Sequence, residues 1–548
     1  MQARPMRRFA LTEEVDFIVV GSGSAGGILA KELSTAGHSV LVLEQGPRLQ
    51  QSQFEHDEHK HLFQNGITSA RPVTWRRSPD QEARQGDGQV LYASLVGGSS
   101  VHFTANFWRF REIDFIEGSR VGGIPGASLV DWPMTYQDLE PYYTKVDWEI
   151  GVSGAPGPFD PPRSRPYPMP PLPVKSSGVL FERGARKLGW HPQPAPMAIN
   201  SRAHNNRPPC QNCGYCMLFG CEYGAKGSSL ATVIPIAEAT GRCEVRPESY
   251  VTRVETDDRG RATGVVYFDG QGREQRQRAK AVVLSCNGAE TARLLLLSSS
   301  PRFPQGLANS SGAVGKYLMF NGNTTAMGQF EHPLNEHKGA QVTRMLWDFY
   351  ETDPKRGFYG GGGMDARFQT WPIVFAQGGL PPNSPQWGRE YTRLLREYYT
   401  RQMTVAGHTT SLPVETNSVT LDPTVKDERG MPAMRITYTD HADDVKTMQF
   451  MVDRSKEILE AAGAKQVWGP DAQVQNFAAH LLGTCRMGKD PRTSVVNIDH
   501  RAHDVPNLFI CDGSSMVSSG RGQPTMTIMA LAFRAGERIA NLARRGEI

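Results

Sequence analysis

The glycine-rich turn at residues 21–26 has the residue types and spacing needed to hold a phosphorylated nucleotide. Gly21 permits a tight bend, Gly23 lets the backbone approach a pyrophosphate, and Gly26 lets a helix pack closely on a strand. The helix that follows presents its N-terminal N–H groups to the phosphates. Glu44 stands 18 residues after Gly26 and can accept hydrogen bonds from a ribose. Together these residues predict a dinucleotide site.

A second group that could do chemistry is the cysteine run Cys210, Cys213, Cys216 and Cys221. Thiolates at this spacing can hold an iron–sulfur cluster, because the run differs by one residue from a ferredoxin-like pattern. Zinc ligation is a second interpretation, and free or disulfide-linked structural cysteines are a third. The remaining cysteines lie in apolar contexts and are expected to be buried free thiols: Cys243, Cys286, Cys485 and Cys511.

Short apolar runs around the glycine turn supply the elements of a βαβ unit. The run from Val15 to Val20 predicts a strand buried on both faces, and the stretch from the turn to Ala36 predicts a helix. Residues 39–43 predict a second strand. A further buried strand is expected at 281–284, and it leads through residues 287–291 into a leucine-rich helix.

These patterns predict an α/β protein in which a Rossmann-like domain is interleaved with a second domain. Residues 1–320 are assigned mainly to the nucleotide-binding domain, with a cysteine-containing loop insertion at residues 60–240 that is rich in Pro, Trp, Tyr and Arg. Residues 321–470 predict a substrate-binding domain, built on an antiparallel sheet covered by helices. Residues 471–548 return to the first domain.

Length and composition exclude several classes of protein. The 548 residues carry a net charge of +4 with scattered basic side chains, which argues against a nucleic-acid partner. No stretch approaches the ~18 apolar residues of a membrane span, so no direct membrane insertion is expected. The N-terminal segment lacks the apolar core and small-residue cleavage site of an export signal. On its own sequence the chain is expected to be cytoplasmic.

Several further motifs, in order along the chain, carry a resemblance to a known family. They are Val96-Gly97-Gly98-Ser99-Ser100, Asn287-Gly288-Ala289-Glu290-Thr291, residues 480–488, Cys511-Asp512-Gly513-Ser514 and Gln523-Pro524-Thr525-Met526-Thr527-Ile528. With the N-terminal turn and Glu44-Gln45-Gly46, they resemble the glucose-methanol-choline (GMC) oxidoreductases along nearly the whole chain. The resemblance implies the GMC fold, with FAD bound between the nucleotide-binding domain and a substrate-capping sheet.

The resemblance also implies which residues contact FAD. They are Gly21, Gly23, Ser24, Ala25, Gly26, Glu44, Gln45, Gly97, Gly98, Ser99, Ser100, His102, Asn106, Val251, Asn287, Ala289, Asp512, Gly513, Pro524 and Thr525. Asp512-Gly513 resembles the family contact to the ribityl chain or pyrophosphate. The helix that starts near Pro524 is expected to direct its N-terminus at the flavin pyrimidine, where negative charge develops on reduction.

The same resemblance places His480 beside flavin N5, as the base that takes the hydroxyl proton while the carbinol hydrogen leaves as hydride. Histidine titrates in the range useful for that role. Gln523 departs from the family pattern, in which Asn or His commonly precedes this proline. Because an amide cannot take a proton at neutral pH, His480 is left as the only base of the pair. The role of Gln523 at the substrate stays open.

The cysteine region, with Gly224-Ala225-Lys226, resembles the gluconate and sorbitol dehydrogenase branch. Related glucose and fructose dehydrogenase subunits use three cysteines here for a [3Fe-4S] cluster, although their spacing is not identical. The resemblance implies a [3Fe-4S] or [4Fe-4S] cluster with Cys216 and Cys221 among its ligands. It also implies a cytochrome electron acceptor and a small signal-bearing subunit, whose co-export would make the periplasm the alternative location.

The reaction that the resemblance implies is oxidation of a secondary alcohol of a sugar, glycoside, polyol or sugar acid to the ketone. Its electrons pass to an acceptor other than NAD. Arg109 and Arg521 could hold a substrate carboxylate. Three alternatives stay open: an oxygen-using sugar or glycoside oxidase, an FAD-containing lyase of the same fold, and a non-catalytic flavoprotein subunit.

Overall fold

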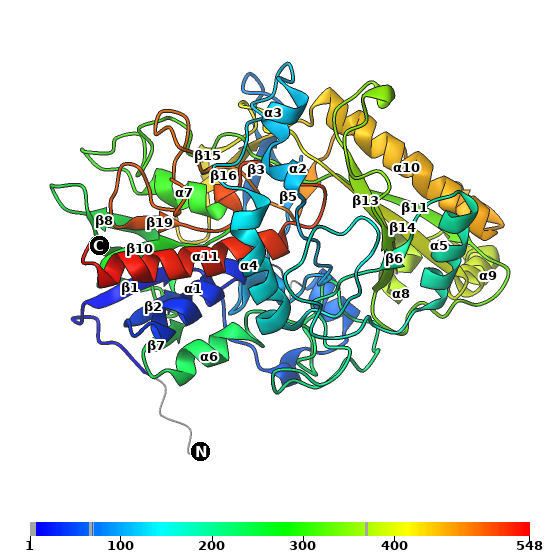
Figure 1. The fold of residues 1–548 in the computed structure, drawn as a ribbon, viewed down its shortest axis with the longest axis horizontal. Coiled ribbons are helices and arrows are strands. Elements are labelled where there is room, and N and C mark those ends of the chain that lie inside the picture. The colour runs from blue at the N-terminus through cyan, green and yellow to red at the C-terminus, as the bar shows by residue number, and fades with distance from the viewer. Residues whose placement is uncertain (1–6, 65–67, 69–70, 368–370) are drawn as a thin grey trace.

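The computed structural model describes residues 7–64, 68, 71–367 and 371–548. Two lobes lie side by side, one built on a mainly parallel sheet and the other on an antiparallel sheet (Figure 1). The N-terminal segment and the last helix both belong to the first lobe, so the chain enters the second lobe and returns.

The first lobe contains a seven-stranded sheet with the order β7-β2-β1-β10-β9-β8, in which β19 also pairs with β10. Its strands are β1 (Val15–Val20), β2 (Val40–Leu43), β7 (Cys243–Arg246), β8 (Tyr250–Thr256), β9 (Ala262–Phe268), β10 (Glu274–Leu284) and β19 (Leu508–Ile510). β1 runs parallel to β2 and to the C-terminal part of β10. The carboxyl ends of these strands therefore meet at one edge, where open α/β sheets bind ligands.

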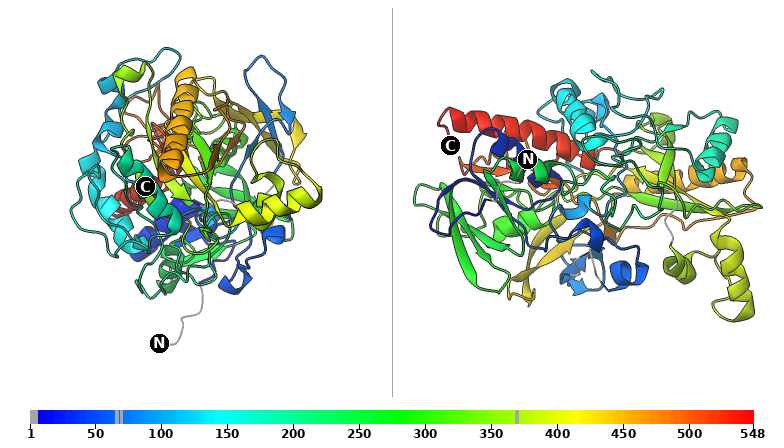
Figure 2. Two further views of the ribbon diagram at one scale, coloured as in Figure 1. Left: turned by 90° about the vertical axis from the view of Figure 1, so that its right-hand side faces the viewer. Right: turned by 90° about the horizontal axis from the view of Figure 1, so that it is seen from below.

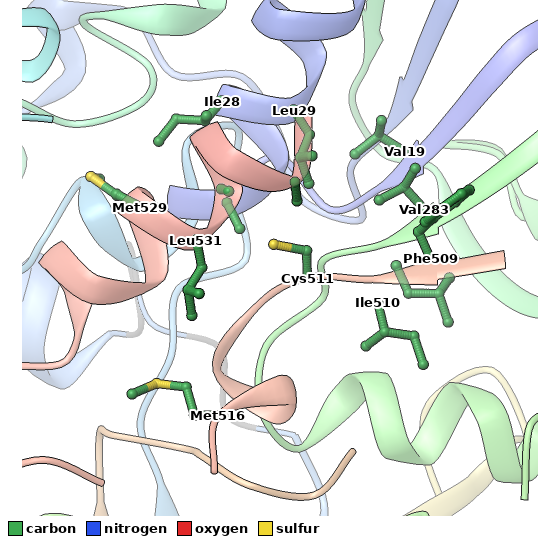
Figure 3. Packing of buried hydrophobic residues seen from close by; sticks show 14 of the residues in the cluster. Val19, Ile28, Leu29, Val283, Phe509, Ile510, Cys511, Met516, Met529 and Leu531 are labelled. Carbon is green, nitrogen blue, oxygen red and sulfur yellow. The ribbon is translucent and has the colours of Figure 1, made fainter. Parts of the chain in front are cut away.

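Helices α1 (Ser24–Thr35) and α11 (Thr525–Arg544) pack against each other and against this sheet (Figure 3). Leu29 from α1, Met529 from α11, and Val283 and Phe509 from the sheet are all fully buried. Apolar burial of this kind is the main favourable term in folding. Helix α4 (Tyr136–Val146) packs on α11, α6 (Val233–Ala239) on α1, and α7 (Glu290–Leu297) on β8.

The second lobe contains a six-stranded sheet with the order β17-β11-β14-β13-β12-β6. Its strands are β6 (Gln193–Pro194), β11 (Asn323–Gln329), β12 (Val342–Leu346), β13 (Gly362–Arg367), β14 (Gln402–Thr409) and β17 (Gln466–Trp468). Every pairing is antiparallel. Helices α5 (Ser176–Lys187) and α10 (Ala442–Ala462) cover the sheet, and Phe181 and Ile458 join its core. One sheet face is therefore shielded by helices.

The remaining elements form smaller units around the two lobes. A four-stranded sheet has the order β15-β16-β3-β4, with β3 (Val73–Arg76), β4 (Arg84–Gln85), β15 (Ser418–Lys426) and β16 (Pro432–Thr437). β5 (Gln89–Val90) pairs with β18 (Phe477–Ala478). The other helices are α2 (Glu112–Phe115), α3 (Glu117–Val121), α8 (Pro372–Gly378) and α9 (Gly388–Tyr399). α9 projects from the end of the second lobe (Figure 2).

The expected α/β fold with a separate antiparallel sheet is confirmed, and the structure adds detail to it. β10 extends well beyond the expected 281–284, because residues 274–280 alternate between exposed and buried in an antiparallel meander. The second lobe also recruits β6 and α5 from the part of the chain assigned to the first domain. Within the described ranges, no helix is long and apolar enough to cross a membrane.

Candidate active site

A cavity of about 1210 Å³, open to solvent, lies at the carboxyl ends of the parallel strands and reaches His480. Of the residues expected to contact FAD or substrate, those that line it are Gly21, Gly23, Ser24, Ala25, Glu44, Gln45, Gly98, Ser99, Val251, Asn287, His480, Asp512, Gly513, Pro524 and Thr525. These segments are far apart in the sequence. They meet because β1, β2, β10 and β19 run parallel and end at the same edge.

The three glycines of the first turn have different structural roles. Gly21 has a φ of +93°, and a Cβ there would lie 2.4 Å from the Ser285 carbonyl oxygen. A Cβ on Gly26 would lie 2.0 Å from the Gly21 oxygen, so the protein's own packing requires glycine at both positions. At Gly23 an added Cβ would contact only the Cα of Gly98, at 3.9 Å. The space in front of Gly23 is therefore available to a ligand.

A second glycine loop closes against this turn. Gly98 has a φ of +54°, and a Cβ on it would lie 2.8 Å from the Cα of Gly23. The Gly97 N–H donates to Ser22 Oγ at 3.0 Å, and that hydroxyl donates to Glu44 Oε2 at 2.7 Å. Glu44, at the end of β2, thereby fixes both loops relative to the sheet.

The cavity offers an acceptor and a set of donors to a nucleotide. Burial raises the pKa of Glu44, and hydrogen bonds from Ser22 and the Gly46 N–H partly oppose that rise. The three hydrogen bonds that Glu44 accepts leave lone-pair capacity on this carboxylate for a ribose hydroxyl. Helix α1 starts after Gly23 without a side-chain cap, so its first N–H groups can bind a phosphate.

Asp512 connects the end of β19 to the segment that follows β10. Its Oδ2 accepts from the Asn287 N–H at 3.1 Å and from Thr291 Oγ1 at 2.6 Å, while Oδ1 accepts from the Ser514 N–H at 2.8 Å. Asn287 has a φ of +138°, and its Oδ1 accepts from the Ala289 N–H at 2.9 Å beside the start of α7. This unusual backbone is held by hydrogen bonds at the cavity wall.

Helix α11 begins at the same cavity. Pro524 precedes its first residue and no side chain caps the N-terminus, so the N–H groups of the first turn are available there. Thr525 and Ile528 line the cavity, which places the positive end of a 20-residue helix at its wall. Negative charge on a bound group at this point would be stabilised.

His480 lies where the cavity approaches the second lobe, and Asn321 determines which of its nitrogens carries the proton. Nδ1 of His480 is 3.1 Å from Oδ1 of Asn321. The Asn321 Nδ2 donates to the carbonyl oxygens of Thr409 at 3.1 Å and Ser519 at 3.2 Å, which fixes the amide orientation. Since Oδ1 can only accept, Nδ1 of the neutral imidazole carries the hydrogen and Nε2 carries the lone pair.

The environment keeps this imidazole uncharged. Burial lowers the pKa of His480 to about 3, and positive charge at His408 and Arg367 acts in the same direction. His480 is therefore neutral at ordinary pH and can accept a proton at Nε2. Gln523 is partly exposed next to Gly522, where an added Cβ would lie 2.8 Å from the His408 Cβ. The loop that carries Gln523 thus borders the second lobe.

Several residues expected to contact FAD lie behind the cavity wall: Gly26, Gly97, Ser100, His102, Asn106 and Ala289. Ser100 Oγ donates to the Gly97 carbonyl at 2.6 Å, which stabilises the loop from behind. Burial and the charge of Lys226 lower the pKa of His102 to about 4. Asn106 points to the second lobe, where its Nδ2 donates to Asp365 Oδ2 at 2.9 Å.

The cavity also has walls that sequence reasoning missed, including Tyr92, Ser249, Tyr250, Cys286, Arg293, Leu297 and Leu481. Tyr92 donates from its hydroxyl to Glu290 Oε1 at 2.6 Å. Glu290 belongs to the motif at residues 287–291 and Leu481 to the motif at residues 480–488, so these two parts of the wall had a signal in the sequence. Cys286 borders the cavity and is partly exposed, contrary to the expected burial, while the other three scattered cysteines are buried and free.

The four clustered cysteines line one small cavity, together with Lys226. Lys226 Nζ donates to the carbonyl oxygens of Phe103 at 3.0 Å and Phe219 at 2.8 Å, which ties the cysteine loop to the segment after the second glycine loop. Among the described residues, however, no three His, Cys, Asp or Glu side chains are arranged to hold a metal ion. The donor set therefore does not fit the expected iron–sulfur cluster or zinc, and all four are free cysteines.

Comparison with known proteins identifies the family. The chain matches the N-terminal domain of the GMC oxidoreductases over residues 15–319 and the C-terminal domain over residues 413–532. This chain belongs to the GMC oxidoreductases, and the resemblance seen in its motifs is confirmed. Members of the family bind FAD, and the glycine loops, the uncapped helix N-termini and Glu44 fit that cofactor. The protein is an FAD-dependent enzyme that acts on alcohol groups.

Three relatives cover nearly the whole chain. A 2-methyl-1,2-propanediol dehydrogenase of Mycolicibacterium austroafricanum is 35% identical, over 96% of this chain and 95% of the relative. A gluconate 2-dehydrogenase flavoprotein of Pantoea cypripedii is 30% identical, over 96% and 94%. A fructose dehydrogenase large subunit of Gluconobacter japonicus is 30% identical, over 98% and 99%. They differ in the charge and size of the alcohols that they are named for.

A solved structure supports the fold independently. Pyridoxine 4-oxidase from Mesorbium loti superimposes with a TM-score of 0.64 at 16% identity, over 96% of this chain and 99% of that one. At this identity the likeness shows the shared fold alone.

Proposed function

We propose that this enzyme oxidises a secondary alcohol of a sugar, glycoside, polyol or sugar acid to the ketone, with His480 as the base. The observation that carries the proposal is a neutral histidine at the cavity that fits FAD, with its Nε2 lone pair unprotonated. FAD, when bound in this cavity, would supply the acceptor for the carbinol hydrogen as hydride. The protein's own task is then to place the alcohol and to take its proton.

His480 takes the hydroxyl proton of the substrate in this proposal. Nε2 of His480 accepts the hydroxyl proton, and the resulting imidazolium keeps its Nδ1–H on Asn321 Oδ1. Asn321 is held by two backbone carbonyls and is 1% exposed, so it orients the ring before substrate arrives. The N-terminus of α11 at the cavity wall would stabilise negative charge on a group bound there. Gln523 borders the same region and orients substrate through its amide.

The electrons are proposed to pass to an oxidant other than NAD, which is either a redox protein or an artificial dye. The enzyme is then a dehydrogenase. Three relatives named as dehydrogenases support this choice. No step is assigned to the cysteine cluster, because its side chains do not fit a metal site. The match to a protein named as a large subunit supports a small partner subunit and a cytochrome acceptor as a second part of the proposal.

The test is the visible spectrum of the purified protein under anaerobic conditions. Addition of a secondary alcohol is expected to bleach the flavin bands, and a dye acceptor should restore them. A flavin that no alcohol bleaches would contradict alcohol oxidation and would leave the lyase or the non-catalytic subunit. Rapid recovery of the bands with dioxygen alone would replace the dehydrogenase with the oxidase.

The cellular location of the protein and its proposed small subunit require separate measurements. We expect the chain in the cytoplasm when it is produced alone. Co-purification with a smaller chain from the native cell, together with recovery in the periplasmic fraction, would support export as a complex instead. Iron analysis of the purified protein tests the cysteine loop, and stoichiometric iron with labile sulfide would show that the loop rearranges around a cluster.

A further inference from the structure

We propose that Arg521 is a positioning residue for the reaction, because it fixes the loop of residues 518–523. That loop holds His480 through Asn321, and it ends at Gln523. The inference deepens the proposed function and rests on it. Arg521 does not line the cavity that reaches His480, so it acts through the loop and not by contact with substrate.

The Arg521 guanidinium is fully buried and bonds to three separate parts of the chain. Its Nε donates to the Tyr350 carbonyl oxygen at 2.6 Å, and its Nη1 donates to Asp114 Oδ1 at 2.5 Å. Its Nη2 donates to Glu117 Oε1. Asp114 belongs to α2 and Glu117 to α3 (Figure 1), whereas Tyr350 follows β12 of the second lobe. Donors in one rigid plane therefore tie the loop to both short helices and to the second lobe.

These contacts replace the role that the sequence suggested for two arginines. Arg521 and Arg109 were expected to be able to hold a substrate carboxylate. Arg521 is instead paired with Asp114, and Arg109 donates to Asp147 at 2.6 Å. Neither arginine lines the cavity that reaches His480, so neither is placed to meet a substrate carboxylate.

The backbone on each side of Arg521 packs directly against aromatic rings. Gly520 has a φ of +61°, and a Cβ there would lie 2.2 Å from the Phe110 ring. Gly522 has a φ of +139°, and a Cβ there would lie 2.8 Å from the Trp108 ring. Only glycine fits such positions, so the loop is closely confined where the guanidinium anchors it.

The carbonyl oxygen of Ser519, two residues before Arg521, reaches the amide that holds His480. Asn321 Nδ2 donates to this oxygen at 3.2 Å, and Asn321 Oδ1 is 3.1 Å from His480 Nδ1. Ser519 Oγ also accepts from the Ser411 N–H at 2.8 Å, which holds the loop to the segment after β14. If the Ser519 carbonyl moved, the amide would lose one of the two bonds that orient it, and the imidazole would lose its fixed tautomer.

The same loop sets the start of α11. Gln523 is followed by Pro524 and Thr525, and the last two line the cavity. Movement of the loop would therefore shift both the Gln523 amide and the helix N-terminus at the cavity wall. Misplacement of reacting groups by about 1 Å can cost about 100-fold in rate. Arg521 thus reaches the reaction by two routes that share one anchor.

The cluster around Arg521 holds two carboxylates and one guanidinium, so an informative substitution must keep the positive charge. Burial raises the pKa of Glu117, the charge of Arg521 opposes that rise, and the neighbouring Asp114 adds to it. Tyr350 donates from its hydroxyl to Asp114 Oδ2 at 2.6 Å. Loss of the cation would leave two buried carboxylates without their ion-pair partner, which is strongly destabilising. Lysine keeps the charge but cannot form the three planar contacts.

The first test is Arg521→Lys in the holoenzyme. We expect FAD to stay bound and anaerobic flavin reduction by a saturating secondary alcohol to slow by about 10- to 100-fold. Arg163→Lys is the matched control: Arg163 is largely buried and donates to Asp147 at 2.7 Å, and its partners among the described residues lie outside the loop. The control should reduce its flavin at the parent rate. A parent-like rate in Arg521→Lys, loss of its FAD, or an equal slowing in the control overturns the inference.

A double-variant cycle separates positioning from a general loosening of the fold. Because Arg521 acts on His480 through Asn321, the double variant Arg521→Lys with Asn321→Ala should reduce its flavin within about threefold of the slower single variant. Rate losses that multiply in the double variant would show that the two residues act independently and would overturn the route through Asn321.

Glu117→Gln covers the case in which Arg521→Lys does not fold. The glutamine keeps an acceptor for Arg521 Nη2 but makes a neutral hydrogen bond, so flavin reduction should slow by about fivefold. A parent-like rate in this variant would contradict the anchoring role of the cluster.

Crystal structures of the parent and variant holoenzymes test the inference without substrate. In Arg521→Lys we expect loss of the contact between Asn321 Nδ2 and the Ser519 oxygen, together with a changed orientation of the His480 ring. Both contacts at their parent lengths would overturn the inference. If no alcohol reduces the flavin of the parent protein, the proposed function fails, while these structures still decide whether Arg521 fixes His480.

Discussion

The cavity that fits FAD is built mainly from backbone, whereas the polar face of the second lobe, which carries Asp365 and His408, is built from side chains. The first uses backbone: the turns at Gly23 and Gly98 and the uncapped starts of α1 and α11. The second uses side chains from neighbouring antiparallel strands, such as Asp365 and His408. Backbone recognition requires particular residue types at fixed spacing, so it leaves a motif. Side-chain recognition across strands has no fixed spacing and leaves none.

This difference teaches how each region should respond to substitution. Substitution of a glycine in the turns at Gly23 and Gly98 should block binding, since the new side chain would occupy the space of the ligand. A residue on the polar face fails by losing a hydrogen bond or by exposing a charge. The first kind of change should remove FAD, and the second should leave FAD bound and alter rate or selectivity.

Substitution of Gly23 by valine should have the largest effect. The side chain would enter the space that the protein leaves open, and we expect loss of bound FAD with retention of the fold. The flavin-to-protein absorbance ratio and a melting curve measure the two outcomes. Gly123→Val is the matched control, because Gly123 is exposed and an added Cβ there meets nothing within 4 Å. A fully flavinated Gly23→Val protein would refute the placement of the pyrophosphate.

Replacement of His480 by alanine should keep FAD bound and slow the reductive half-reaction by about 10²- to 10⁴-fold, the usual scale for loss of an acid–base group. Stopped-flow reduction of the flavin by a saturating neutral alcohol gives the rate constant. Reduction at nearly the parent rate would exclude His480 as the base.

Replacement of Asn321 by alanine should have a smaller effect, of about tenfold, because the ring loses its partner but not its basicity. The informative readout is the pH profile of flavin reduction. The parent His480 is neutral well below pH 6.5, so lowering the pH toward 5 should not remove the base. The variant imidazole can carry its proton on either nitrogen, so its rate at saturation should fall throughout that range. Recovery of the parent rate in Asn321→Gln would show that the acceptor oxygen is what matters.

Substitution of Gln523 by asparagine should have the smallest effect, a loss of no more than a few-fold, since an amide remains at the position. Separate kcat and KM values would show whether the loss concerns substrate placement. A decrease as large as that in His480→Ala would mean that the reach of the Gln523 side chain is critical to the reaction.

Sequence patterns predicted the structure best where short-range chemistry determines the local conformation. The strand from Val15 to Val20, the glycine turn and the acid at the end of β2 could be placed because short-range sterics require them. The length of β10 and the transfer of β6 to the second lobe could not, because strand pairing depends on segments distant in the chain. For the cysteine run the sequence left three interpretations open, because spacing alone does not show how the thiols are arranged.

By itself, the sequence determined the family, the nucleotide cradle and the candidate base, since each depends on residue types at fixed intervals. The tertiary structure decided how that base is held and what faces it. Asn321 is 159 residues from His480, and Arg521 reaches Asp114 across 407 residues. Only the folded structure shows that the Asn321 amide sets the tautomer of His480. It also shows that Arg109 and Arg521 are already paired with carboxylates. Charge balance in a buried site depends on three-dimensional neighbours, and these have no period or spacing in the chain.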